Sequence, residues 1–146
     1  MKSVRIVLLV VCALALLVAC GGSAAVVPTA LAKVDTALPA DPALDAIIAG
    51  WKTEAKAGLA LGSVKPESIV EETYHSSADL SAVADYYNKQ LGTGGWTFRK
   101  RTPGLNPDGF FLAGYDQGNQ SLVIGAVDLK KFGSTGSYVY VLHGTK

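Results

Sequence analysis

The side chains of this sequence best suited to acid–base catalysis are two histidines, His75 and His143. A histidine titrates near neutral pH and can therefore act as a general base. Each of them falls in a segment that is expected to be a strand, and neither has a recognisable catalytic surrounding. The Gly-x-Ser-x-Gly signature of serine hydrolases is absent from the sequence. We therefore expect no enzymatic activity, and a small enzyme that uses His75 or His143 is kept as an alternative.

The sequence does not indicate a metal or cofactor site. A zinc site takes three or four protein ligands, whereas this chain has two histidines, and Cys12 and Cys20 both belong to its N-terminal region. Glu71 and Glu72 are neighbours on an expected strand, so they point to opposite faces and cannot act as a pair. The glycine-rich residues 92–95 follow a helix and precede a strand, which is the reverse of a phosphate-binding loop. We expect no metal and no cofactor.

Contact with another molecule is a second kind of chemistry that the residue types allow. Arg99, Lys100 and Arg101 form the one cluster of positive charge. It is interpreted either as a solvated strand end or as a contact with anionic lipid headgroups. Tyr86 and Tyr87 are adjacent on an expected helix and cannot share one face. Tyr87 falls on the apolar stripe, so Tyr86 is the better candidate for a contact residue.

The first twenty residues have the layout of an export leader. Lys2 and Arg5 precede an uncharged apolar run, residues 6–18, which is shorter than the roughly 20 residues of a transmembrane helix. The run ends in Leu17-Val18-Ala19-Cys20, which resembles the lipobox of bacterial lipoproteins. The resemblance implies cleavage before Cys20 and a diacylglyceryl group on its sulfur. Such a double chain is a stable membrane anchor. An ordinary signal peptide with a chance cysteine is the alternative.

Composition limits what the exported part can be. The chain has 146 residues, and removal of the first 19 leaves 127, enough for a single domain with a proper core. Loss of the two basic residues of the leader changes the balance of 13 basic and 12 acidic groups to 11 against 12. A nearly neutral exported domain is not expected to bind nucleic acid.

The elements that must position these residues follow from caps and periodicity. Residues 20–40 are expected to be a tether, and residues 41–146 a single globular domain. Asp41 and Pro42 indicate a helix start, and the helix is expected to reach about Lys56. Its apolar face comprises Leu44, Ile47, Ile48, Trp51 and Ala55. This face either docks on the domain or forms an interface with a second copy or another protein.

A strand over residues 68–75 and a second helix follow. Ser77 is the expected N-cap of this helix, and Gly92 its stop. Trp96 is expected to be buried where the helix meets the sheet. Three further strands with turns between them are expected over residues 96–101, 110–115 and 121–129, and a last one over residues 137–143. The continuous apolar run of residues 121–129 indicates a central strand.

The expected fold is α+β: a two-layer sandwich whose antiparallel sheet of about four strands carries one or two helices on one face. The globular part is assigned to no family. We expect a lipid-anchored domain outside the cytoplasm, on the outer face of the cytoplasmic membrane or facing a periplasm. Its role would be non-enzymatic binding or envelope structure, with an envelope protein or a second copy as partner. A protein with an apolar ligand pocket between sheet and helix is a further alternative.

Overall fold

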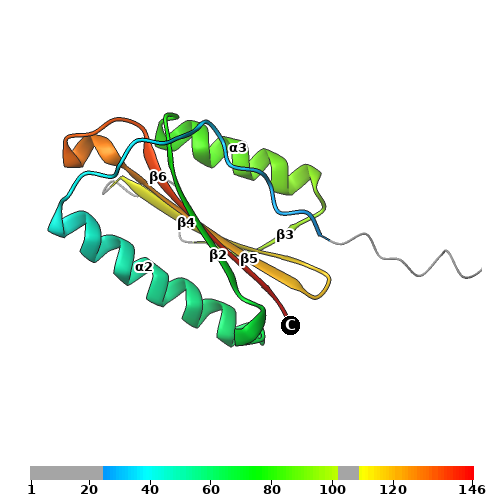
Figure 1. The fold of residues 1–146 in the computed structure, drawn as a ribbon. Helices are drawn as coiled ribbons and strands as arrows, with labels where there is room; N and C mark the ends of the chain where they lie inside the picture. Colours follow the sequence, from blue (N-terminus) through cyan, green and yellow to red (C-terminus); the bar gives the residue numbers. More distant parts are fainter. Residues whose placement is uncertain (1–24, 102–108) are drawn as a thin grey trace, which may run out of the picture.

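The computed structural model describes residues 25–101 and 109–146, and these residues form an α+β fold, which confirms the expected class. One antiparallel sheet of six strands lies between two helices (Figure 1). The strand order is β1-β2-β6-β5-β4-β3. The strands are β1 (Lys33–Val34), β2 (Val70–Ser76), β3 (Thr97–Arg101), β4 (Phe110–Gln117), β5 (Gln120–Asp128) and β6 (Ser137–Thr145). The helices are α2 (Pro42–Leu61) and α3 (Leu80–Thr93), with short 3-10 turns at η1 (Pro66–Ser68) and η2 (Leu129–Phe132).

The centre of the sheet is formed by β5 and β6, as the apolar run predicted for β5. Strands β3 to β6 form a meander, and β2 joins it by pairing with β6, so that Tyr74 lies opposite Val139. Alternate residues of β6 enter different cores. Tyr138, Tyr140 and Leu142 face one side of the sheet, whereas Val139 and Val141 face the other.

The two helices lie on opposite faces of the sheet, and this corrects the expected two-layer arrangement. Helix α2 covers the core that contains Tyr140 and Leu142, and α3 covers the core that contains Val139 and Val141. The physical reason is that β5 and β6 are apolar on both sides, so each face must be shielded from water. The sheet also has six strands rather than about four, because each of the five expected strand segments pairs in it and a short β1 joins one edge.

Helix α2 begins as predicted. The Asp41 carboxylate accepts hydrogen bonds from the amides of Ala43 at 2.7 Å and Leu44 at 3.3 Å, and Pro42 is the first helical residue. The helix ends at Leu61, five residues after the predicted Lys56. Its apolar face docks on the sheet through side chains that include Leu44, Trp51, Ala55 and Leu59, which are all buried. The apolar face of α2 therefore packs against the sheet of its own domain.

The N-cap of the second helix, α3, lies two residues after the predicted one. Asp79, not Ser77, is the N-cap, and its carboxylate accepts a hydrogen bond from the amide of Ala82 at 2.8 Å. The helix ends at Thr93, beyond the predicted Gly92. Trp96, which follows, is 6 % exposed and belongs to the same core as Tyr87 and Leu91, as predicted.

Residues 25–36, here called the N-terminal segment, pack on the domain although they fall within the predicted tether. Ala25, Val27, Ala30 and Leu31 contact the core under α3, and β1 pairs with β2. In Figure 1 the segment runs along the α3 side of the sheet. Within the described ranges, no helix is both long and apolar enough to cross a membrane. Cys20 lies outside the described residues.

Candidate functional site

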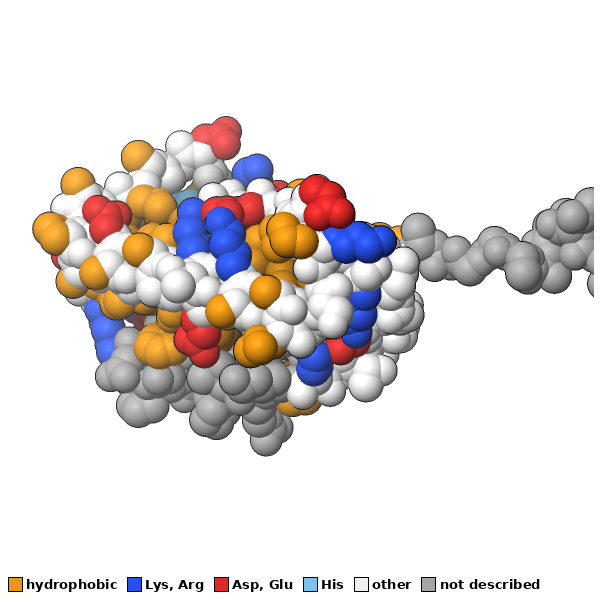
Figure 2. Space-filling model, turned by 90° about the horizontal axis from the view of Figure 1, so that it is seen from below, with side chains coloured by type: hydrophobic (Ala, Val, Ile, Leu, Met, Phe, Trp, Pro, Cys, Tyr) orange, Lys and Arg blue, Asp and Glu red, His pale blue; other side chains and the backbone are white. Residues whose placement is uncertain are grey.

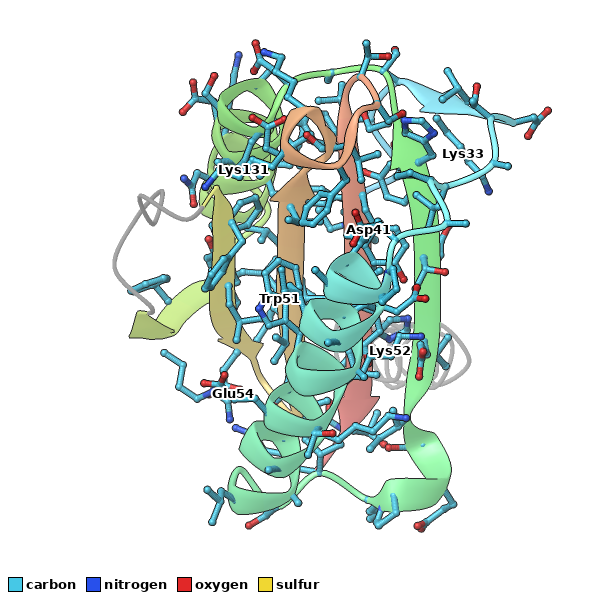
Figure 3. All side chains as sticks on the ribbon, turned by 90° about the vertical axis from the view of Figure 1, so that its left-hand side faces the viewer. Lys33, Asp41, Trp51, Lys52, Glu54 and Lys131 are labelled. Atoms are coloured by element: carbon cyan, nitrogen blue, oxygen red, sulfur yellow. The ribbon has the colours of Figure 1, made fainter. Side chains whose placement is uncertain are left out.

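A pocket of about 400 Å³ opens between the C-terminal half of α2 and strands β3, β4 and β5. Helix α2 packs mainly over β5 and β6, so it leaves the part of this face that belongs to β3 and β4 less covered. In Figure 3, Glu54 lies on the side of α2 toward β3 and β4, and Lys52 lies toward β2. The lining residues are Glu54, Ala55, Gly58, Leu61, Gly62, Arg99, Leu112, Ala113, Gly114 and Val123. Most of this lining is apolar.

Three glycines make room for the pocket. A Cβ atom at Gly58 would meet nothing within 4 Å, so this helix position faces open space. A Cβ at Gly62 would collide with Nη1 of Arg99, and a Cβ at Gly114 would lie 3.5 Å from Nη2 of the same guanidinium. The Arg99 head group therefore lies between the end of α2 and the middle of β4, where two side chains are missing.

The guanidinium of Arg99 is held by a carboxylate that also has other partners. Nε of Arg99 lies 3.6 Å from Oδ2 of Asp116, and Nζ of Lys146 lies 3.3 Å from Oδ1. The Ser121 hydroxyl donates a hydrogen bond to the same carboxylate. Burial of Asp116 favours its neutral form, but the Ser121 hydrogen bond and the charges of Arg99 and Lys146 outweigh burial and hold its pKa below the usual value. Asp116 is therefore a charged anchor for Arg99.

The direction of Arg99 depends on an irregularity of β3. The register with β4 shifts between Phe98 and Lys100, which is a β-bulge at Arg99. Phe98 packs edge-on against Tyr115 at 5.4 Å, on the α3 side, while Arg99 reaches the α2 side. The backbone of Lys100 and Arg101 belongs to β3, but their side chains lie outside the described part of the structure. Arg99 is thus the one member of the predicted basic cluster whose side chain the structure describes, and this side chain lines the pocket.

His75 connects two segments of the chain that are distant in sequence. Its side chain is 7 % exposed, with Nδ1 3.0 Å from the carbonyl oxygen of Thr36 and Nε2 2.9 Å from that of Thr135. The first contact holds the N-terminal segment and the second holds the loop before β6. Both ring nitrogens therefore contact the protein's own backbone.

His143 lies half-buried on β6, on the α3 side of the sheet, and neither histidine lines the pocket. Burial lowers the pKa of His143, and the negative charge of Glu72 opposes that shift. Glu71, by contrast, points to the α2 side, where it pairs with Lys52 at 2.8 Å and Lys56 at 3.1 Å. The two glutamates thus face opposite sides, as their adjacency predicted.

Tyr86, the other predicted contact residue, binds the protein's own chain. Its hydroxyl donates to the carbonyl oxygen of Thr29 at 3.1 Å and lies 3.2 Å from the Thr29 hydroxyl. Its ring packs edge-on against Tyr87 at 5.2 Å. Trp96 donates similarly from Nε1 to the carbonyl oxygen of Val26 at 3.3 Å. These contacts attach the N-terminal segment to α3.

The charged side chains on the α2 side are of both signs. Figure 2 shows blue and red side chains side by side on this face, with apolar atoms between them. This mixture matches the nearly equal totals of acidic and basic groups in the sequence. Among residues 25–101 and 109–146, no cluster of three or more histidine, cysteine or carboxylate side chains is arranged to hold a metal ion.

The described residues define an α+β domain in which two helices enclose a six-stranded antiparallel sheet and leave a mainly apolar pocket, lined by Arg99, beside α2. Comparisons of the chain with protein-family models, with curated proteins and with solved structures found no match.

Sequence reasoning named Arg99 and kept an apolar pocket between sheet and helix as an alternative, but it did not identify the glycines that line this pocket. The available signals were isolated glycines within regular elements: Gly58 in a helix and Gly114 in a strand. A glycine there weakens the element and often marks a place where another group approaches closely. These signals do not say which element faces the glycine, so they could not reveal a pocket between α2 and β4.

Proposed function

We propose that this protein is a lipid-anchored domain outside the cytoplasm that binds a small, mainly apolar molecule in the pocket between α2 and strands β3 to β5. The observation that carries the binding role is the pocket of about 400 Å³ with its apolar lining. Small-molecule sites commonly span about 300–1,000 Å³ and combine apolar walls with a few polar groups. The lipid anchor rests on the lipobox-like residues that end at Cys20.

A binding role fits the described residues better than catalysis. The charged side chains that line the pocket are Glu54 and Arg99, and the histidines lie elsewhere. An acid–base mechanism requires a titratable group within hydrogen-bond reach of the substrate. Among the described lining residues, Glu54 is the candidate for such a group, and it lies at an exposed position of α2.

A photoreactive apolar probe tests this proposal in the membrane. The full chain is expressed with its leader in a bacterial host, and isolated membranes are irradiated with decan-1-ol that carries a diazirine and an alkyne. We expect labelled residues in α2 between Glu54 and Gly62 and in β4 around Leu112, identified by mass spectrometry. Gly58→Leu should abolish this labelling because its side chain fills open space in the pocket.

Gly50→Leu is the matched control. Gly50 lies in the same helix and also faces space without a neighbour within 4 Å, but it does not line the pocket. Both substitutions replace a helical glycine, so both should raise helix propensity alike. Equal labelling of both variants, or labelling spread evenly over the chain, would contradict the proposal.

A further inference from the structure

Among the described residues that line the pocket, Arg99 is the positively charged one, and its guanidinium has unused capacity for hydrogen bonds. A guanidinium carries five N–H donors in a planar fork. Among the described residues, the ion pair of Arg99 is made by Nε with Asp116, at 3.6 Å, while Nη1 and Nη2 lie against Gly62 and Gly114. Arg99 lines the pocket directly. Its outer nitrogens are therefore placed to receive the head group of a bound molecule.

Asp116 does not depend on Arg99 alone. When the guanidinium turns part of its fork toward a ligand, Lys146 and Ser121 still contact the Asp116 carboxylate. A buried or half-buried carboxylate without partners would be costly, and these two contacts avoid that cost. Two cations share one carboxylate here, so the cluster of Arg99, Lys146 and Asp116 carries one net positive charge.

The negative group that lines the pocket lies at its other end. Glu54 is eight residues before Gly62 on α2, which corresponds to roughly 12 Å along the helix axis. The apolar surface of Ala55, Leu112 and Val123 lies in the wall of the same pocket. A ligand with its anionic end at Arg99 thus has that end near Gly62, about 12 Å along the helix axis from the backbone of Glu54.

We propose that the ligand of this pocket is an amphiphile with one anionic head group, which Arg99 binds, and an apolar body, which lies against Ala55, Leu112 and Val123. This inference rests on the proposed binding function. Arginine pairs bidentately with the oxygens of a carboxylate or a phosphate, so both head groups share the chemistry that the geometry selects.

Competition for the photoreactive decan-1-ol tests the head group on the full chain in membranes. Decanoate, decyl phosphate and unlabelled decan-1-ol are compared by the concentration that halves labelling of the pocket residues. We expect one or both anions to compete at least about tenfold better than the alcohol, a gain typical of charge-assisted hydrogen bonds. The better of the two identifies the head group.

Variants of Arg99 separate recognition from folding. Arg99→Gln should abolish the advantage of the anion while leaving competition by decan-1-ol within about twofold, and Arg99→Lys should keep part of the advantage because it retains the charge. Lys146→Gln is the matched control. It removes the other cation of Asp116, but Lys146 does not line the pocket, so the advantage should persist.

The outcomes distinguish this inference from the binding function itself. If the pocket is labelled but the anions compete no better than decan-1-ol, or if Lys146→Gln abolishes their advantage as fully as Arg99→Gln, the anionic head group is wrong and the binding function stands. If the pocket is not labelled at all, the binding function fails first.

Discussion

Arg99 reaches the pocket because its surroundings lack side chains at two positions. Gly62 and Gly114 flank the guanidinium, and the β-bulge at Arg99 interrupts the regular ladder of β3 and β4. Asp116 then holds Nε, with Lys146 and Ser121 as its further partners. A surface ion pair alone contributes little to stability. We therefore infer that the contacts of Asp116 matter mainly because they hold the Arg99 guanidinium in the pocket. Their contribution to the free energy of folding is expected to be small.

At the same scale, His143 should make the protein less stable as the pH falls from about 7 to about 5. Burial lowers its pKa in the folded state below the ordinary value of 6.5, with partial opposition from Glu72. The unfolded chain therefore binds this proton at a higher pH than the folded chain does. Stability is retained above the unfolded-state pKa and decreases as the pH falls through it toward the folded-state pKa.

Urea unfolding at both pH values measures this dependence, and His143→Gln should make it shallower because glutamine does not titrate. The comparison of slopes within each protein removes the constant cost of the substitution. An unchanged slope in His143→Gln would show that other groups set the pH dependence in this range.

At the scale of elements, α2 is fixed on the sheet by close packing in its middle and by charge at its side. The Trp51 ring packs edge-on against Phe110 at 4.9 Å, and a Cβ at Gly125 would lie only 3.3 Å from that ring. Lys52 and Lys56 pair with Glu71 of β2. The tryptophan thus fills the space that Gly125 leaves in β5, while the lysines fix the side of the helix toward β2.

Trp51→Ala should lower the free energy of unfolding by about 3–5 kcal/mol, the range for a large aromatic side chain removed from a core. Trp51 is 6 % exposed, whereas Leu61 at the end of the same helix is 89 % exposed. Leu61→Ala is therefore the control and should change stability by less than about 0.5 kcal/mol. Denaturant unfolding of both variants measures the difference, and similar losses in the two would contradict the docking of α2 through Trp51.

The two edge strands of the sheet are short or irregular. β1 has two residues, and β3 has five residues with a bulge. Such features discourage the edge-to-edge pairing of sheets between molecules. The long strands β5 and β6 lie in the interior of the sheet, where both of their edges are paired.

At the scale of the whole molecule, the N-terminal segment and the pocket lie on opposite faces of the sheet. The segment runs on the α3 side of the sheet (Figure 1) and contacts the core under α3. The pocket is lined by residues of α2 on the other side. His75 connects the segment to the loop before β6 through its two carbonyl contacts. A chain attached through Cys20 would therefore enter the domain on the face that does not contain the pocket.

The lipid anchor itself is testable by metabolic labelling. Cells that express the full chain and grow with alkyne-tagged palmitate should yield a labelled protein, and Cys20→Ala should remove the label because the thioether cannot form. Cys12→Ala is the matched control, since Cys12 lies within the leader that cleavage would remove. Label that survives Cys20→Ala would refute the lipoprotein hypothesis.

Local sequence was sufficient where neighbours along the chain decide the structure. Asp41 and Pro42 specify the start of α2, and the apolar run of residues 121–129 specifies a central strand, because capping and strand burial depend on a few adjacent residues. The same reasoning failed for α3. β2 continues to Ser76, and the amide of Ser77 donates to the carbonyl oxygen of Ala32 at 2.9 Å. Contact with the N-terminal segment therefore holds Ser77, and Asp79 caps the helix instead.

The sequence by itself predicted the α+β class, the apolar face of α2 and the burial of Trp96 from periodicity and from the order of the elements. Whether the face of α2 docks on the sheet was decided by the tertiary structure. Only the tertiary structure decided that the helices occupy opposite faces, because that choice depends on both sides of β5 and β6 requiring cover. It also decided the pocket. Gly58, Gly62 and Gly114 are all distant in sequence from Arg99, and their missing side chains form a site only where α2 lies beside β4.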